Sequence, residues 1–149
     1  MANTSEYIQV EKVALRLIAR AEQCTNGLSL KLEKRGYDPA CVSKVISDLT
    51  EKGLLNNSRF SRFWLQSRIR FARSPRRLLS SLCARGIDHD DAETALKEVL
   101  KEDETEFTML KKFVKKYGKK TSGEARSLKY LLKNEGFSLT AIQRFLGEE

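Results

Sequence analysis

Residues 28–46 of this chain read LSLKLEKRGYDPACVSKVI, and the same pattern returns twice at a spacing of 50 residues. The second copy, residues 78–96, reads LLSSLCARGIDHDDAETAL, and the third, residues 128–146, reads LKYLLKNEGFSLTAIQRFL. Such self-similarity is typical of repeat proteins, in which each copy is one structural unit. The positions that recur are Leu28, Leu78 and Leu128; Leu32, Leu82 and Leu132; and Gly36, Gly86 and Gly136.

Each copy is expected to form three helices. In the first copy, apolar residues recur at helical spacing over residues 6–21. A second helix is expected from residue 25 to Gly36, where glycine accepts the left-handed conformation that ends many helices. Asp38 then offers a capping side chain with proline directly after it, so a third helix is expected from there to Gly53.

The later copies repeat this punctuation. The second copy is expected to open its first helix at Asn57 or Ser58 and continue it to Arg73; it should then use Ser74, Gly86 and Asp88 as helix boundaries. The third is expected to use Asp103 or Glu104, Gly118, Thr121 or Ser122, Gly136 and Ser138. We therefore predict an all-α fold of three tandem three-helix repeats, over residues 6–55, 56–102 and 103–149, stacked into an elongated curved array.

The second repeat contains a window without acidic residues. No Asp or Glu lies between Lys52 and Ile87, although nine Lys and Arg residues lie in residues 52–86. The whole chain has 28 basic and 20 acidic residues, so the remainder is close to neutral. A positive field confined to one repeat indicates an anionic partner, such as nucleic acid or an acidic protein groove.

A helix over residues 57–73 would sort the side chains of this window into two stripes, because each residue turns the helix by about 100°. We expect the basic stripe to face outward and the aromatic stripe to enter the core. The basic stripe contains Arg59, Arg62, Gln66, Arg70 and Arg73, and the aromatic stripe contains Phe60, Trp64, Ser67 and Phe71.

Arg76 and Arg77 follow Ser74 and Pro75 in the first turn of the next expected helix. The helix dipole disfavours cations there, whereas the free N–H groups attract anions. This placement suits a phosphate or carboxylate ligand, which the planar guanidinium group binds with two parallel hydrogen bonds.

A second basic cluster lies in the third repeat, among several glutamates. It serves either as a solvated charged face or as an auxiliary electrostatic surface for the same partner. It consists of Lys111, Lys112, Lys115, Lys116, Lys119 and Lys120.

Enzyme, metal and membrane signatures are missing from the sequence. There is no phosphate-binding loop, nucleophile elbow or HExxH motif, and neither a metal nor a cofactor is expected. Cys24, Cys41 and Cys83 lack paired spacing and should be reduced and packed as small apolar residues. His89, the only histidine, should lie on the surface. No apolar run could span a bilayer and the first residues do not form a secretory signal, so a cytoplasmic protein is expected.

At residues in its first and middle repeats the chain resembles the RecX family of bacterial regulatory proteins. Residues 14–20 and 32–37 are similar to the first repeat of that family. The chain departs from the family at Asn56, Asn57 and Ser58, where acidic residues are usual, and at Ser74, where glycine is frequent. The middle repeat carries the resemblance in Lys52-Gly53-Leu54-Leu55, Arg59-Phe60, Arg68, Arg76-Arg77-Leu78, Leu82 and Arg85-Gly86-Ile87-Asp88.

The resemblance implies a non-catalytic protein that binds the RecA nucleoprotein filament, in its helical groove or at its growing end. Such binding suppresses ATP hydrolysis, strand exchange and the coprotease role of the filament in the SOS response. The alternative is a DNA-binding protein whose repeats grip the phosphate backbone of single- or double-stranded DNA directly. In either case we expect a monomer. The expected filament- or DNA-binding residues are Arg59, Arg62, Arg68, Arg70, Arg73, Arg76, Arg77 and Arg85.

Overall fold

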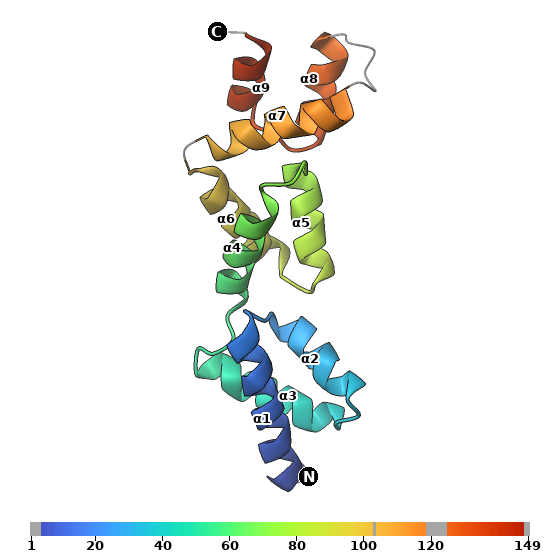
Figure 1. Cartoon of the computed structure of the whole chain (residues 1–149), viewed down its shortest axis with the longest axis vertical. Helices are drawn as coiled ribbons and strands as arrows, with labels where there is room; N and C mark the ends of the chain where they lie inside the picture. Colours follow the sequence, from blue (N-terminus) through green and yellow to red (C-terminus); the bar gives the residue numbers. More distant parts are fainter. Residues whose placement is uncertain (1–3, 103, 119–124, 148–149) are drawn as a thin grey trace.

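The computed structural model describes residues 4–102, 104–118 and 125–147 (Figure 1). These residues form nine helices and no strand, so the predicted all-α class is confirmed. The predicted helix starts at Asp103, Thr121 and Ser122 lie at or outside the limits of this description. The helices are α1 (Thr4–Arg20), α2 (Thr25–Lys34), α3 (Pro39–Glu51), α4 (Asn57–Arg68), α5 (Pro75–Ala84), α6 (His89–Leu100), α7 (Thr105–Tyr117), α8 (Ala125–Asn134) and α9 (Leu139–Leu146).

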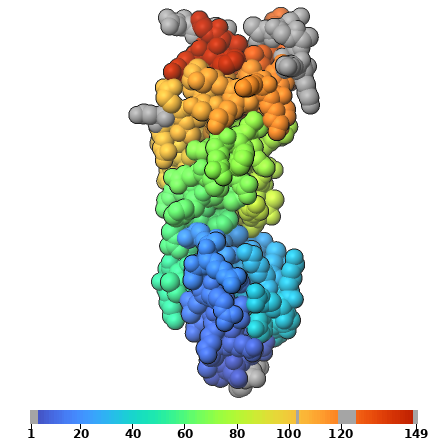
Figure 2. Space-filling model, in the orientation of Figure 1, coloured from blue at the N-terminus to red at the C-terminus, as the bar shows by residue number. Residues whose placement is uncertain are grey.

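The helices pack in three groups, which we call the first unit (α1–α3), the second unit (α4–α6) and the third unit (α7–α9). Within the first unit, and likewise within the second, each helix contacts the other two. In the third unit α9 contacts both α7 and α8, and α6 of the second unit contacts α7 of the third. The groups follow one another along the long axis of the molecule, which is elongated (Figures 1 and 2). The curvature of the array and the exact repeat boundaries stay predictions. No helix of the described ranges has both the length and the apolar character that a membrane crossing requires.

Helix capping follows the sequence only in part. The side chains of Ser74 and Ser138 accept hydrogen bonds from the N–H groups of Arg77 and Ala141, as the sequence predicts. The predicted capping by the side chains of Asp38 and Asp88 is wrong, because neither makes a cap hydrogen bond. Both carboxylates still place negative charge at a helix N-terminus, which the dipole favours without a direct bond.

The first helix of a unit supports the start of the third in two of the units. Glu6 of α1 accepts a hydrogen bond from the backbone N–H of Asp38 at 2.8 Å, and Glu106 of α7 accepts one from that of Ser138 at 3.1 Å. Both pairs are 32 residues apart and the two bonds are separated by two periods of the repeat, so the first and third copies share this hydrogen bond. The second unit has Asn56 at this register, and its side chain caps α4 instead.

The predicted helix over residues 57–73 is wrong at its end, because α4 stops at Arg68. Turns follow, in which the N–H of Phe71 donates to the carbonyl of Arg68 and the N–H of Arg73 donates to the carbonyl of Phe71. Pro75 also disfavours helical geometry at the residue before it, so the chain leaves the helix before α5 begins. Arg70 and Arg73 therefore do not share a helical stripe with the arginines of α4.

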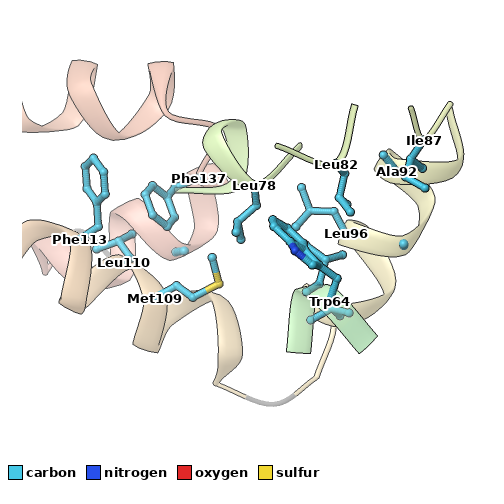
Figure 3. Close-up of a cluster of buried hydrophobic side chains, with 14 of the residues drawn as sticks. Trp64, Leu78, Leu82, Ile87, Ala92, Leu96, Met109, Leu110, Phe113 and Phe137 are labelled. Carbon is cyan, nitrogen blue, oxygen red and sulfur yellow. The ribbon is translucent and has the colours of Figure 1, made fainter. Parts of the chain in front are cut away.

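The hydrophobic core has two parts, and this division sets how the units are joined. The first unit has its own core, which includes Val10, Leu28, Leu32, Val42, Val45 and Leu49. The second and third units share one continuous core. Figure 3 shows Met109, Leu110 and Phe137 of the third unit beside Leu78 and Trp64 of the second. Because burial of apolar surface is the main stabilising force, these two units should unfold together.

The contact between the first and second units, which we call the first seam, is mostly polar. The side chains of Cys24 and Asn26 contact the backbone carbonyl of Arg85 at 3.8 and 3.4 Å. Thr25 and Asn57 exchange two hydrogen bonds, of 3.0 and 3.2 Å. Among the described residues of the first unit, only Cys24 joins the shared core. The first seam is therefore a smaller and more polar joint than the one between the second and third units.

Gly86 offers a test of the first seam, with Gly36 as its control. The two glycines have similar backbone conformations, but only Gly86 lies close to Asn26. Their φ angles are +87° and +91°, but a Cβ atom on Gly86 would lie 2.8 Å from the Cβ of Asn26, whereas one on Gly36 meets nothing within 4 Å. Both alanine variants should lose about 1 kcal/mol to backbone strain. Gly86→Ala should lose about 1 to 2 kcal/mol more from the clash. Urea unfolding followed by circular dichroism measures both, and equal losses would contradict the close approach of Gly86 to Asn26.

Candidate functional site

The predicted binding arginines divide into two sets according to their charge partners. Arg59 pairs with Glu22 of the first unit at 2.5 Å and also donates to the carbonyls of Gly53 and Leu54. Arg62 lies 3.5 Å from Glu98 of α6. These two arginines are engaged within the chain, Arg59 across the first seam and Arg62 between two helices of the second unit.

Arg76 and Arg77 meet an anion at the start of α5, and the anion comes from the third unit. The carboxylate of Glu135 is 3.1 Å from Nη2 of Arg76 and 3.9 Å from Nε of Arg77. It also accepts a 2.5 Å hydrogen bond from the hydroxyl of buried Ser74. The backbone N–H of Arg76 donates to the carbonyl of Glu135 at 2.9 Å. We call this cluster the Glu135 latch.

The ionised form of Glu135 is favoured in the folded protein. Burial of the side chain by itself raises the pKa of Glu135. Hydrogen bonds from Ser74 and Arg76, together with the positive charges of Arg76 and Arg77, outweigh burial, and the net pKa is lowered. The latch is therefore charged at neutral pH and joins the second and third units in addition to their shared core.

The other four predicted arginines, Arg68, Arg70, Arg73 and Arg85, have no carboxylate partner among the described residues. Two of them lie over an aromatic ring of the core, because the guanidinium groups of Arg68 and Arg85 are 5.5 and 5.2 Å from the ring centroid of Trp64. The Nε–H of Arg68 is buried without a hydrogen-bond acceptor. The second unit thus keeps positive charge that the described part of the chain does not neutralise.

Part of this charge lines a cavity of about 390 Å³, which we call the basic pocket. It lies between the turn after α4, the start of α5 and the end of α7. None of the described residues that line it is acidic, and in this sense we call it acid-free. They are Arg68, Phe71, Ala72, Arg73, Arg77, Lys116 and Tyr117.

Aromatic rings accompany the cations of the basic pocket. The guanidinium group of Arg77 and the ammonium group of Lys116 lie 5.2 and 5.3 Å from the ring centroid of Tyr117. Phe71 is 45% exposed, and the guanidinium group of Arg70 is 5.1 Å from its ring centroid. Cations in a concave, acid-free site attract phosphate or carboxylate groups, and an exposed ring can stack on a flat partner.

Phe71 and Tyr117 are the pocket residues that sequence reasoning missed. The predicted aromatic stripe is correct for Trp64, which is buried, and for Phe60, which packs against the core. It is wrong for Phe71, because this residue follows the end of α4 and its ring is not held against the core. Pro75 does not mark the end of α4 at Arg68, because proline disfavours helical geometry only at the residue before it, Ser74.

The lysines of the third unit have separate surroundings. Lys116 lines the basic pocket, whereas Lys112 donates to the backbone carbonyl of Arg70 at 3.0 Å and supports the turn. Lys111 lies over the ring of Phe107 at 4.8 Å, and Lys115 is exposed. Lys119 and Lys120 lie outside the described residues.

Two other candidate sites contain acidic residues, unlike the described lining of the basic pocket. A larger cavity, of about 640 Å³, lies between the second and third units, and its rim interleaves Glu93 and Glu106 with Lys97 and Lys101. At the start of α6, donor atoms of His89, Asp90 and Glu93 lie within 4.8 Å of one another at the surface. The three cysteines are free, and Cys24 and Cys41 are buried, as the sequence predicts.

The chain is similar to curated and solved proteins over most of its length. It is 34% identical over 142 residues to the regulatory protein RecX of Treponema pallidum, which covers 95% of this chain and 85% of that one. It is 30% identical over 144 residues to the regulatory protein RecX of Pseudomonas fluorescens, covering 93% and 90%. The crystal structure of RecX from Lactobacillus salivarius superposes with a TM-score of 0.73, covering 98% and 97% of the two chains at 20% identity. No family model matches the chain.

The fold and the site define a class of protein: an elongated all-α chain of three-helix units with an acid-free basic pocket. The identities extend across all three units at a level that shows common descent. The chain belongs to the RecX family of regulatory proteins.

Proposed function

We propose that this chain is a non-catalytic negative regulator of RecA. In this proposal it binds the RecA–DNA filament as a monomer and lowers its ATP hydrolysis, strand exchange and SOS coprotease activity. Membership of the RecX family supports the choice of RecA as the partner. The elongated shape also suits contact with several neighbouring subunits of a helical filament (Figure 2).

The basic pocket indicates which surface of the chain binds the filament. Arg68, Arg73 and Lys116 face it, and no carboxylate of the described part of the chain lines it, whereas Arg59 and Arg62 are paired elsewhere. An unneutralised cluster speeds encounter with a polyanionic filament and fixes the orientation of the bound protein. We therefore propose the basic pocket as the main contact with the filament, and Arg70 and Arg85 as flanking cations.

The second candidate function is direct gripping of the DNA backbone, which the same cluster favours. A backbone binder holds naked DNA tightly and releases it steeply as salt rises. A filament regulator needs RecA to act at low concentration. The two functions therefore differ in whether naked DNA alone accounts for the effect.

The test is RecA ATP hydrolysis on single-stranded DNA, titrated with the full chain at near-physiological salt. Binding of the chain to the same DNA without RecA is measured in parallel. We expect inhibition at concentrations well below those that coat naked DNA. If inhibition begins only where the chain already covers the DNA by itself, the backbone-binding function replaces the proposed one.

A further inference from the structure

The basic pocket contains an exposed aromatic ring, Phe71, as well as cations. This ring helps to distinguish between a nucleic-acid ligand and an acidic protein ligand. Cations alone are enough to bind an acidic side chain of a protein partner, so such a ligand would not require the ring. The ring of Phe71 is 45% exposed beside those cations and makes no contribution to the described core. An exposed ring at the rim of an acid-free cavity is the arrangement with which proteins bind unstacked bases, because every base has a flat face.

We propose that the basic pocket binds one nucleotide of a single DNA strand. The phosphate lies against Arg73, Arg77 and Lys116, and the base stacks on Phe71. The cavity of about 390 Å³ has the size of an ordinary small-ligand site, which is about 300 to 1,000 Å³. The inference deepens the proposed function and rests on it only for the source of the strand, which is the DNA within the filament.

Arg77 can serve the nucleotide without breaking the Glu135 latch. Its Nε atom is 3.9 Å from the carboxylate of Glu135, which is longer than a hydrogen bond. The shorter contacts of the latch, at 2.5 and 3.1 Å, belong to Ser74 and Arg76. The guanidinium group of Arg77 also lies over Tyr117, at the wall of the pocket. It therefore keeps donors for a phosphate oxygen.

The turn that carries Phe71 is held by two hydrogen bonds. The N–H of Phe71 donates to the carbonyl of Arg68 at 3.0 Å, and Lys112 of α7 donates to the carbonyl of Arg70 at 3.0 Å. A ring placed on a held turn loses less conformational freedom when a base stacks on it than a ring on a free loop would. In duplex DNA the faces of the bases are already stacked on one another, so this site prefers single strands.

The first experiment measures binding of the full chain to a fluorescein-labelled oligodeoxythymidylate, without RecA, by fluorescence anisotropy. Phe71→Ala should weaken binding about 10-fold, since stacking of one base contributes about 1 to 3 kcal/mol. Phe71→Trp should bind at least as well as the unchanged chain. The matched control is Phe63→Ala, because Phe63 is an exposed ring on α4, 58% accessible, that does not line the pocket. It should change binding less than twofold.

The second experiment separates base stacking from charge. An abasic strand of equal length should bind about as weakly to the unchanged chain as the thymidylate does to Phe71→Ala. The double variant Arg73→Ala, Arg77→Ala should reduce the slope of log affinity against log salt by about 0.7, the value for one lost phosphate contact on a single strand. Polyglutamate should compete poorly, and free thymidine triphosphate should compete weakly, because a strand also makes flanking phosphate contacts.

Equal binding of abasic and thymidylate strands, or an unchanged affinity in Phe71→Ala with a normal melting temperature, would overturn the nucleotide site. Competition by polyglutamate as strong as that by the oligonucleotide would overturn it also, in favour of an acidic protein ligand. RecA inhibition is measured with the same variants. A chain that binds thymidylate through Phe71 but never inhibits RecA would keep the nucleotide site and contradict the proposed function.

Discussion

Replacing Glu135 with alanine is expected to lower the free energy of unfolding by about 3 kcal/mol. The variant leaves the buried hydroxyl of Ser74 without its acceptor and removes the charge-assisted hydrogen bond from Arg76. For a chain of this size the melting temperature should fall by about 10 °C. Thermal unfolding followed by circular dichroism measures the change.

Two further variants show whether charge or shape matters in the latch. Glu135→Gln keeps an acceptor for Ser74 but loses the charge, so it should cost about 1 kcal/mol. The matched control is Glu33→Ala, because Glu33 is exposed on α2 and should change stability by less than about 0.5 kcal/mol. A Glu135→Ala variant as stable as this control would show that the latch does not join the two units.

The contribution of the latch also depends on pH in a definite direction. Because the folded protein lowers the pKa of Glu135 from its ordinary value of 4.5, the stabilisation is present above that value and is lost as the pH falls through the folded pKa. The stability difference between the unchanged chain and Glu135→Gln should therefore shrink on acidification from neutral pH.

Reversing two exposed cations of the basic pocket, Arg73→Glu with Lys116→Glu, is expected to weaken RecA inhibition about 30-fold, equivalent to about 2 kcal/mol. In the proposed function, each substitution would replace an attraction for the filament with a repulsion. Neither side chain belongs to the hydrophobic core or to an ion pair between described residues, so the fold should survive. The concentration that halves RecA ATP hydrolysis measures the effect.

The matched control reverses the same two residue types on the first unit, as Lys12→Glu with Arg16→Glu. Both lie exposed on α1, and the change in net charge is identical. If this control weakens inhibition as much as the pocket variant does, net charge and not the basic pocket governs binding. Reversal of Arg59 or Arg62 would be a poorer test, because it would also break the ion pairs to Glu22 or Glu98.

Most helix boundaries could be predicted from the sequence, because they depend on local chemistry. Gly36, Gly86 and Gly136 follow α2, α5 and α8 with φ angles of 91°, 87° and 92°, as the repeat predicts. Ser74 and Ser138 cap the helices that they were expected to cap. Because the pattern recurs every 50 residues, the helix boundaries of one copy could be checked against those of the other two.

The arrangement of charges could be predicted only in part, because it depends on contacts between units. The position of Arg76 and Arg77 at a helix start predicts an anion there, but it does not identify that anion as Glu135, 59 residues away from Arg76. A signal was present: the residue before the repeated glycine is Arg35 in the first copy and Arg85 in the second, but Glu135 in the third. The basic pocket was beyond reach because it combines a turn of the second unit with Lys116 and Tyr117 of the third.

The unequal joints between the units bear on how such a chain would meet a filament. The second and third units share a core and the Glu135 latch, so they present the basic pocket as one rigid body. The first seam relies on few polar contacts and on the Arg59–Glu22 ion pair. We expect the first unit to adjust its angle on binding while the basic pocket keeps its shape.

Photo-cross-linking from inside the basic pocket shows whether this pocket contacts the filament. A photoreactive phenylalanine analogue is placed at position 71, or at position 63 as the control, and each protein is irradiated with RecA filaments on single-stranded DNA. We predict a strong adduct with the DNA or RecA of the filament from position 71 and little from position 63. Adducts of equal yield from both positions, or adducts from position 63 alone, would contradict the claim that the basic pocket contacts the filament.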